Sequence, residues 1–165
     1  MIKIDETDLR ILALLQKNGR ITNRELSEEL GLSPTPIFER VKKLEKSGII
    51  AHYSAVLDAS KLGKHLYAFA HISLKDHTKE KVAQFSADIN EMEEVQECHY
   101  VTGDSDFILK ILLSSMEDYR DFMMNKIFEL QNIAKVESFL SLSVAKRNNF
   151  ISLQSNEMKS LESRL

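Results

Sequence analysis

The chain has 165 residues, a net charge of −3, 43% hydrophobic residues and 28% charged residues, which is ordinary for a soluble globular protein of one or two domains. It contains no run of about 18 apolar residues and no apolar signal core, so we expect a cytoplasmic protein with no membrane partner. Its single cysteine, Cys98, excludes an internal disulfide and fits a reducing compartment.

The charge is unevenly distributed along the chain. Residues 1–60 hold nine Lys/Arg and nine Asp/Glu, whereas residues 61–165 hold thirteen basic and sixteen acidic residues. Four basic residues fall between positions 40 and 46 with only Glu45 opposing them: Arg40, Lys42, Lys43 and Lys46. A basic stripe on one helix suits a surface that faces phosphates, and a solvated helix face is the alternative.

Hydrophobic periodicity predicts two helices at the start of the chain. Leucines recur at helical spacing over residues 5–17, and Gly19 is expected to end this helix in the left-handed conformation. A second helix starts after Thr22, which forms a capping box with Glu25, and Gly31 ends it.

Both prolines of the chain, Pro34 and Pro36, lie where a third helix should begin. A proline inside a helix costs about 3 kcal/mol. If Ser33 is the N-cap, however, the prolines occupy the first turn, whose N–H groups have no intrahelical acceptor. The buried face of this helix is then formed by Ile37, Val41 and Leu44. Three helices joined by short turns predict a helix-turn-helix unit.

The period changes after Gly48. Residues 49–58 are typical of a strand or ribbon, and a hinge follows them. Further on, strands are predicted over 65–75, 95–102, 106–114 and 136–145, and helices over 78–90 and 116–130. The order βαββαβ is typical of the ferredoxin-like fold, in which two helices cover one face of the sheet. Tyr67, Phe69, Phe107 and Leu109 add apolar surface to the strands, and some of it is expected on the open face. An open apolar face predicts a partner, most simply another copy.

The predicted fold class is therefore α+β. A winged helix-turn-helix DNA-binding domain spans 1–50, a ribbon and hinge linker spans 51–64, and a ferredoxin-like domain spans 65–147. The polar tail over 148–165 receives no function; a short helix and disorder both fit its composition.

Three stretches carry a resemblance to a known family: "IDETDLRILALLQKNGRITNRELSEELGLSPTPIFERVKKLEKSGII", "YSAVLDASKLG" and "HYVTGDSDFILKI". With them the chain resembles the Lrp/AsnC (leucine-responsive, feast/famine) family of prokaryotic transcription regulators. The resemblance implies a sequence-specific DNA-binding regulator whose ferredoxin-like (RAM-type) domain responds to a small effector, usually an amino acid.

In a helix-turn-helix the helix after the turn enters the major groove of double-stranded DNA with its N-terminal end foremost. Contacts to base edges are therefore expected from Ser33, Thr35, Pro36, Phe38 and Glu39. Contacts to phosphates or guanine edges are expected from Arg40, Lys42 and Lys43. Arg40 has an alternative role as an ion-pair partner of Glu25 or Glu28. Glu39 could accept a hydrogen bond from cytosine N4.

A Gly-Asp turn lies between two of the predicted strands. Backbone N–H groups of such a turn can hold a carboxylate and an aspartate can hold an ammonium, which an amino acid needs together. The resemblance implies an effector site between neighbouring dimers, with Ser141 coming from the neighbouring subunit: Tyr100, Thr102, Gly103, Asp104, Asp106 and Ser141. Ordinary turn chemistry, with Asp106 capping the turn, is the alternative.

The resemblance also implies a homodimer assembled into an octamer or another ring of dimers. No catalytic residue, metal site or cofactor is predicted, because the histidines and Cys98 lack zinc-type spacing and no phosphate loop, nucleophile elbow or HExxH motif is present. Two alternatives remain open at this point: an enzyme similar to the siroheme decarboxylases, whose helix-turn-helix should be degenerate, and an amino-acid sensor without DNA activity.

Overall fold

The structure, a computed structural model, describes residues 3–153 and divides into two compact units. The first unit comprises the described residues up to Val56 and those from Arg147 onward, and the second is Leu57–Lys146. The start of the predicted linker and the start of the predicted tail thus both belong with the helix-turn-helix. Residues 154–165, which make up most of that tail, lie outside the described part.

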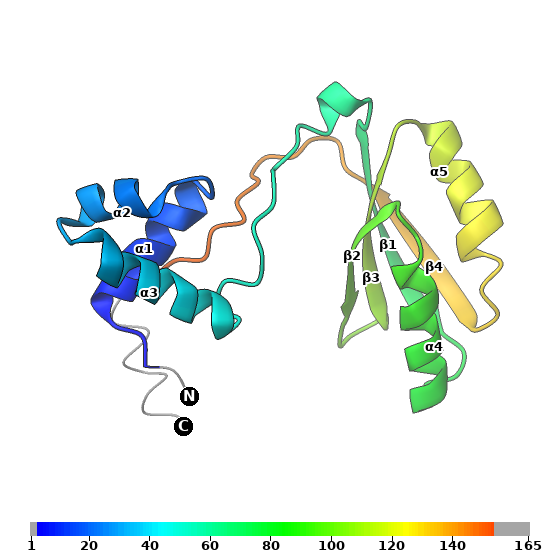
Figure 1. Cartoon of the computed structure of the whole chain (residues 1–165). Helices are drawn as coiled ribbons and strands as arrows, with labels where there is room; N and C mark the ends of the chain where they lie inside the picture. The colour runs from blue at the N-terminus through cyan, green and yellow to red at the C-terminus, as the bar shows by residue number, and fades with distance from the viewer. Residues whose placement is uncertain (1–2, 154–165) are drawn as a thin grey trace. The chain divides into compact units, whose positions relative to one another are not determined.

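Three helices build the first unit: α1 (Glu6–Lys17), α2 (Asn23–Leu30) and α3 (Pro34–Lys46). Capping boxes start α1, through Asp5, and α2, through Thr22, while Gly31 ends α2 with a φ of 66°. The helices enclose a small apolar core made of Ile11, Leu26, Ile37, Val41 and Leu44. This arrangement, seen in Figure 1, confirms the predicted helix-turn-helix.

The prolines occupy the positions that the sequence predicts. Ser33 is the N-cap of α3, Pro34 is its first residue and Pro36 its third, so neither ring removes a hydrogen bond from the helix. The Ser33 side chain itself makes no capping hydrogen bond. The fixed φ of proline therefore starts this helix without help from a side-chain cap.

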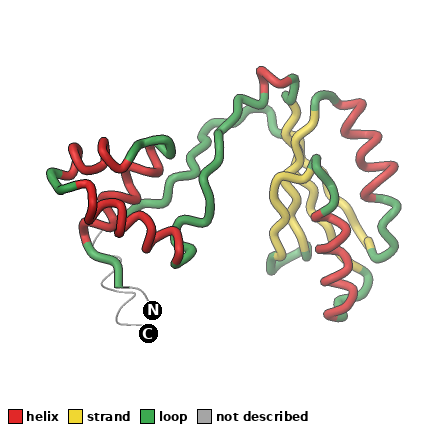
Figure 2. The backbone as a smooth tube through the Cα atoms, in the orientation of Figure 1, coloured by secondary structure: helices red, strands yellow, loops and turns green. Residues whose placement is uncertain are grey.

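Two expectations for this unit are wrong. Gly19 does not adopt a positive φ; instead Asn18 leaves the helix in an extended conformation with its N–H bonded to the Leu14 carbonyl. Residues 49–58, predicted as a strand or ribbon, form no strand in the described chain and appear as a loop in Figure 2. A strand needs a neighbour for its backbone groups, and this segment pairs with none within residues 3–153.

The linker is fixed to the first unit at Tyr53. Its hydroxyl donates to the Glu45 carboxylate at 3.0 Å, and its ring lies close enough to Gly19 that an added Cβ there would be 3.7 Å from Tyr53 Cδ1. Partial burial, together with this acceptor, raises the pKa of Tyr53 to about 12. The segment that follows α3 is therefore held against α3 by this hydrogen bond.

The returning segment, residues 147–153, is held on α1. The Gln16 side-chain amide donates to the Ile151 carbonyl at 3.1 Å and accepts from the Ile151 N–H at 2.7 Å. One side chain thus satisfies both backbone groups of Ile151, as a neighbouring strand would. This pair explains why the segment groups with the helices of the first unit.

The second unit has four strands and two main helices: β1 (Leu66–Leu74), α4 (Lys79–Asn90), β2 (Val95–Tyr100), β3 (Phe107–Leu113), α5 (Met116–Phe122) and β4 (Ile133–Leu140). A short 3₁₀ turn, η1 (Ser60–Leu62), precedes β1, and a π-helical turn, η2 (Met123–Ile127), extends α5. The strands are antiparallel in the order β2-β3-β1-β4. Both helices lie on one face of the sheet (Figure 1), which confirms the ferredoxin-like fold.

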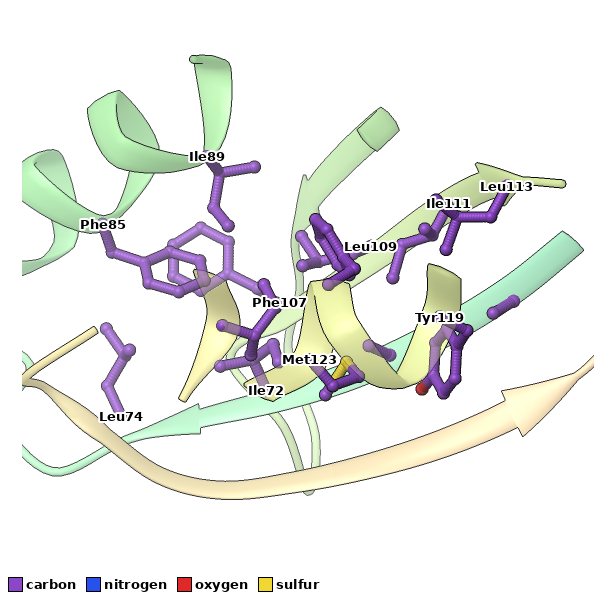
Figure 3. Packing of buried hydrophobic residues seen from close by; sticks show 14 residues of the cluster. Ile72, Leu74, Phe85, Ile89, Phe107, Leu109, Ile111, Leu113, Tyr119 and Met123 are labelled. Carbon is purple, nitrogen blue, oxygen red and sulfur yellow. The ribbon is translucent and has the colours of Figure 1, made fainter. Parts of the chain in front are cut away.

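A continuous apolar core fills the space between this sheet and its helices (Figure 3). The Phe85 and Phe107 rings lie 4.5 Å apart between α4 and β3. Phe107 and Leu109 face the helices and are buried, whereas Phe69 is 37% exposed on the open face, so part of the predicted apolar surface lies there. Strand register decides this, because alternate residues of β1 and β3 point to opposite faces.

Candidate functional site

The outward face of α3 is formed by residues that lie opposite its buried side. Its exposed members include five predicted DNA contacts: Thr35, Pro36, Phe38, Glu39 and Lys42. Because Ile37, Val41 and Leu44 are at most 8% exposed against the core, helical geometry directs the first set away from the unit. Five of the eight predicted DNA contacts, and the exposed N-cap Ser33 beside them, therefore share one accessible surface.

Phe38 and Lys42 form a pair on that surface. The Lys42 ammonium lies 5.4 Å from the centroid of the Phe38 ring, a cation–π arrangement one helical turn apart. Phe38 is nevertheless 47% exposed. The Phe38 ring is therefore accessible to solvent, with the positive charge of Lys42 over one of its faces.

Arg40 is held differently from its neighbours. Its guanidinium donates to Asp5 at 2.6 Å and to Asp8 at 2.7 Å, and the Asp8 side chain is fully buried. The alternative partners suggested by the sequence are wrong. The Glu25 carboxylate instead accepts hydrogen bonds from Thr22, and that of Glu28 pairs with Arg24.

Lys43 joins the same cluster. Its ammonium donates to the Lys3 carbonyl at 2.8 Å and lies 3.5 Å from the Asp8 carboxylate. Two of the three cations expected on phosphates thus connect α3 to α1 inside the unit. The sequence indicated that Asp8 would need a cationic partner. Asp8 lies on the same helical stripe as Ile11 and Leu15, and an aspartate on a buried stripe is normally paired.

The Asp5 cap gives the first unit a pH dependence. Hydrogen bonds from the Asp8 N–H and from Arg40 lower the pKa of Asp5 below its ordinary value. A carboxyl with a lowered pKa stabilises the fold above its unfolded pKa, near 3.9, and that contribution is lost as the pH falls through the folded value. We expect Asp5→Ser, which keeps a capping oxygen but does not titrate, to flatten the pH dependence of unfolding below pH 4. An unchanged acid profile in urea titrations would contradict this.

The predicted effector turn connects β2 to β3. Gly103 has a φ of 126°, a conformation that L side chains rarely adopt. Thr102 and Asp104 are exposed beside it, and the Asp104 carbonyl accepts from the Ser73 hydroxyl at 3.3 Å. The turn is therefore fixed to β1 while its side chains remain accessible.

Asp106 is engaged within the fold. Its carboxylate accepts from the Leu74 N–H at 2.7 Å and lies 3.0 Å from His77 Nε2. Its backbone N–H also donates to the Ile72 carbonyl at 2.8 Å. Through these contacts Asp106 attaches the turn to the end of β1.

The remaining effector candidates lie at different ends of the sheet. Tyr100 is 64% exposed at the end of β2, and its ring lies tilted against that of Phe107 with the centroids 4.9 Å apart. Ser141 follows β4, just outside the strand in which it was expected, and its N–H donates to the Tyr67 carbonyl. The turn contacts Ser73, six positions further along β1, or about 20 Å at the usual rise per residue. Within one chain, Ser141 cannot share a site with the turn.

Two hollows on the helix side of the second unit do not include these residues. The first lies between α4 and the residues before β4, with Lys81, Phe85 and Asp88 among its lining residues. The second lies beside α5 and includes Lys64, Glu94 and Lys126. Within residues 3–153, no three His, Cys, Asp or Glu side chains are grouped to hold a metal ion. No helix of that part is long and apolar enough to cross a membrane.

A helix-turn-helix with an accessible recognition helix, followed by a ferredoxin-like domain, defines a ligand-responsive transcription regulator. Family models match both parts: "Winged helix-turn-helix DNA-binding" over residues 4–51 and "Lrp/AsnC ligand binding domain" over residues 67–150. The chain belongs to the Lrp/AsnC family of transcriptional regulators.

Relatives along the whole chain agree with this assignment. The chain is 38% identical to the leucine-responsive regulatory protein of Haemophilus influenzae over 151 residues, covering 92% of this chain and 91% of that protein. It is also 38% identical to the protein of the same name in Escherichia coli K12, covering 88% of this chain and 89% of the relative.

Solved structures have the same fold. A transcriptional regulator of Neisseria meningitidis, determined as a complex with L-Met, superposes with a TM-score of 0.87 at 32% identity, covering 92% of this chain and 97% of that one. AsnC of E. coli superposes with a TM-score of 0.83 at 28% identity, covering 90% and 99%.

Proposed function

We propose that this regulator reads DNA through the outward face of α3 and binds an amino acid at the turn between β2 and β3. The observation that carries the DNA-binding half of this proposal is the N-terminal end of α3, whose first turn is accessible and uncharged. Lys42 follows one turn after Phe38. The second half rests on the Gly103 turn and on the L-Met complex of the Neisseria meningitidis relative. On this proposal the chain acts in the cytoplasm by binding and not by catalysis.

The proposed DNA contacts fall into two groups. Thr35, Phe38 and Glu39 lie where a recognition helix meets base edges, and Glu39 can accept from cytosine N4. Of the three cations expected on phosphates, Lys42 is the best suited, because Arg40 and Lys43 are engaged with Asp8. We assign Arg40 and Lys43 the indirect role of holding α3 in position.

Replacement of Lys42 tests the phosphate contact. We expect Lys42→Ala to weaken binding to specific and random duplexes alike, and to make the slope of log K against log salt shallower by about 0.9 for each bound recognition helix, as for one phosphate. Fluorescence anisotropy at several salt concentrations measures this slope. Lys79→Ala, an exposed lysine of the second unit, is the control and should leave it unchanged. A slope that stays the same in Lys42→Ala would exclude Lys42 from the phosphate contact.

The proposed effector site combines an anion-binding turn with an acidic side chain. Backbone N–H groups around Gly103 would hold the carboxylate of the amino acid, and Asp104 its ammonium. Thr102 and Tyr100 would line the site. Asp106 supports the site by fixing the turn to β1. Ser141 would come from a neighbouring subunit, since it lies at the far end of β1.

Calorimetric titration with the common amino acids tests this site. We expect at least one to bind, and Asp104→Ala to weaken that binding by tenfold or more, because a charge-assisted hydrogen bond contributes about 1.5–3 kcal/mol. Glu91→Ala, which removes an exposed carboxylate on the helix side of the same unit, should bind normally. Equal affinity of the Asp104→Ala protein would refute the role of Asp104.

A homodimer formed through the open sheet face is part of the proposal. Phe69 and Phe139 lie side by side in the β1–β4 register, and they are 37% and 51% exposed. Apolar side chains in a row on an uncovered face favour association with another copy. Dimers would present two recognition helices to half-sites about one helical turn, or a multiple, apart. Effector binding at junctions of dimers, in an octamer or another ring, would then shift the assembly.

A further inference from the structure

The front of the recognition helix carries few hydrogen-bonding groups. Pro34 and Pro36 have no N–H, and both are exposed. Leu32, in the turn before them, is 42% exposed, and Phe38 is 47% exposed. From Leu32 to Phe38 the exposed side chains are therefore apolar apart from the hydroxyl groups of Ser33 and Thr35.

Such a front is poorly suited to phosphate. A helix N-terminus normally binds anions through its free N–H groups and its dipole, and here two of the first three helical residues are prolines. The first turn also carries no charged side chain. The positive charge of this face begins only at Lys42, which lies behind the Phe38 ring.

An apolar surface in the major groove has one chemical counterpart. Each base pair presents hydrogen-bond donors and acceptors there, and thymine adds the only apolar group, its C5 methyl. Contact of a hydrophobic side chain with that methyl buries apolar area on both partners, whereas contact with the other base edges would leave polar atoms without partners.

We propose that Phe38 recognises thymine through its 5-methyl group, with the ring held in place by Lys42. This inference rests on the proposed DNA-binding function and specifies the base chemistry that it reads. The cation–π pair limits the motion of both side chains, so the ring is preset for the contact and the ammonium stays near the adjacent backbone. The prolines contribute by removing two amide hydrogens that the methyl contact would otherwise desolvate, so that among the first three helical residues only Thr35 keeps one.

The experiment uses duplexes that the full-length protein enriches from a random library. Each thymine of an enriched duplex is replaced singly by deoxyuridine, which keeps every hydrogen-bonding group and lacks only the methyl. We expect the original protein to lose about fourfold in affinity at one position in each half-site. This is the loss expected when the burial of one methyl group is removed. Phe38→Ala should bind the thymine and uracil duplexes equally, and Phe38→Leu should keep part of the difference.

Phe128→Ala is the matched control, since it removes an exposed aromatic ring from the second unit, and it should retain the full methyl sensitivity. Binding by the original protein that ignores every uracil substitution would overturn the inference while leaving the proposed function intact. So would methyl sensitivity that persists in Phe38→Ala. If no duplex binds in a salt-dependent manner, the proposed function itself fails and the inference fails with it.

Discussion

Asp8→Ala is expected to destabilise the first unit by about 3 kcal/mol. The Asp8 carboxylate is fully buried and pairs with Arg40 and Lys43 from α3. Removing one partner of a buried ion pair costs about 3–5 kcal/mol because the other charge is left without compensation. The lower end applies here, since Arg40 keeps Asp5 and both cations are partly exposed. Hydrogen exchange of the α1–α3 amides in urea, followed by mass spectrometry, measures the loss.

The control for this prediction is an ion pair of the same unit on its surface. Arg24 and Glu28 lie 3.0 Å apart, with side chains 85% and 64% exposed, so Glu28→Ala should change the free energy of unfolding by less than about 0.5 kcal/mol. The destabilisation caused by Asp8→Asn should lie between those of Asp8→Ala and Glu28→Ala, because the amide can still accept a hydrogen bond from Arg40. Equal stabilities of Asp8→Ala and the original protein would show that the cluster does not hold α3 in place.

Phe107→Ala is expected to destabilise the second unit by about 4 kcal/mol. The side chain is 1% exposed and its ring lies tilted against those of Phe85 and Tyr100, so truncation leaves a large cavity between β3 and the helices. Tyr100 also loses the ring that orients it, and we therefore expect amino-acid binding to weaken in parallel. Urea denaturation followed by hydrogen exchange, resolved by peptide, assigns the loss to residues 57–146.

Phe128→Ala provides the comparison within the same unit. Its ring is 53% exposed, so truncation should cost less than about 1 kcal/mol. The amides of α1–α3 should keep their protection in both variants if the two units unfold separately. Simultaneous loss of protection in both units would show instead that they form one cooperative structure.

Local sequence signals were sufficient for the helices and strands that form, although they also predicted a strand or ribbon over residues 49–58 that is absent from the described chain. Capping residues act three positions ahead, as in Thr22 with Glu25, and apolar residues repeat with the helical period, as in Ile37, Val41 and Leu44. These interactions are formed within one or two turns of chain, so the sequence alone specifies them. The same locality explains why the positions of Pro34 and Pro36 could be predicted.

The local signals were weaker at the ends of elements. Gly19 was expected to end α1 in the left-handed conformation, and Asn18 in an extended conformation ends it instead. The predicted helix over 116–130 changes to a wider π-helical turn at Met123. Such endings depend on packing against neighbours, such as Tyr53 over Gly19, and propensity alone does not resolve them.

The sequence by itself thus determined the order of helices and strands, the helix-turn-helix, and the side chains that point away from its core. Only the tertiary structure decided that Arg40 joins Asp8, 32 positions away, that Asp106 fixes the end of β1, and that Phe107 is buried. Helix periodicity and capping depend on neighbouring residues, whereas ion pairs and strand register depend on how distant segments pack. That packing exists only once the chain has folded.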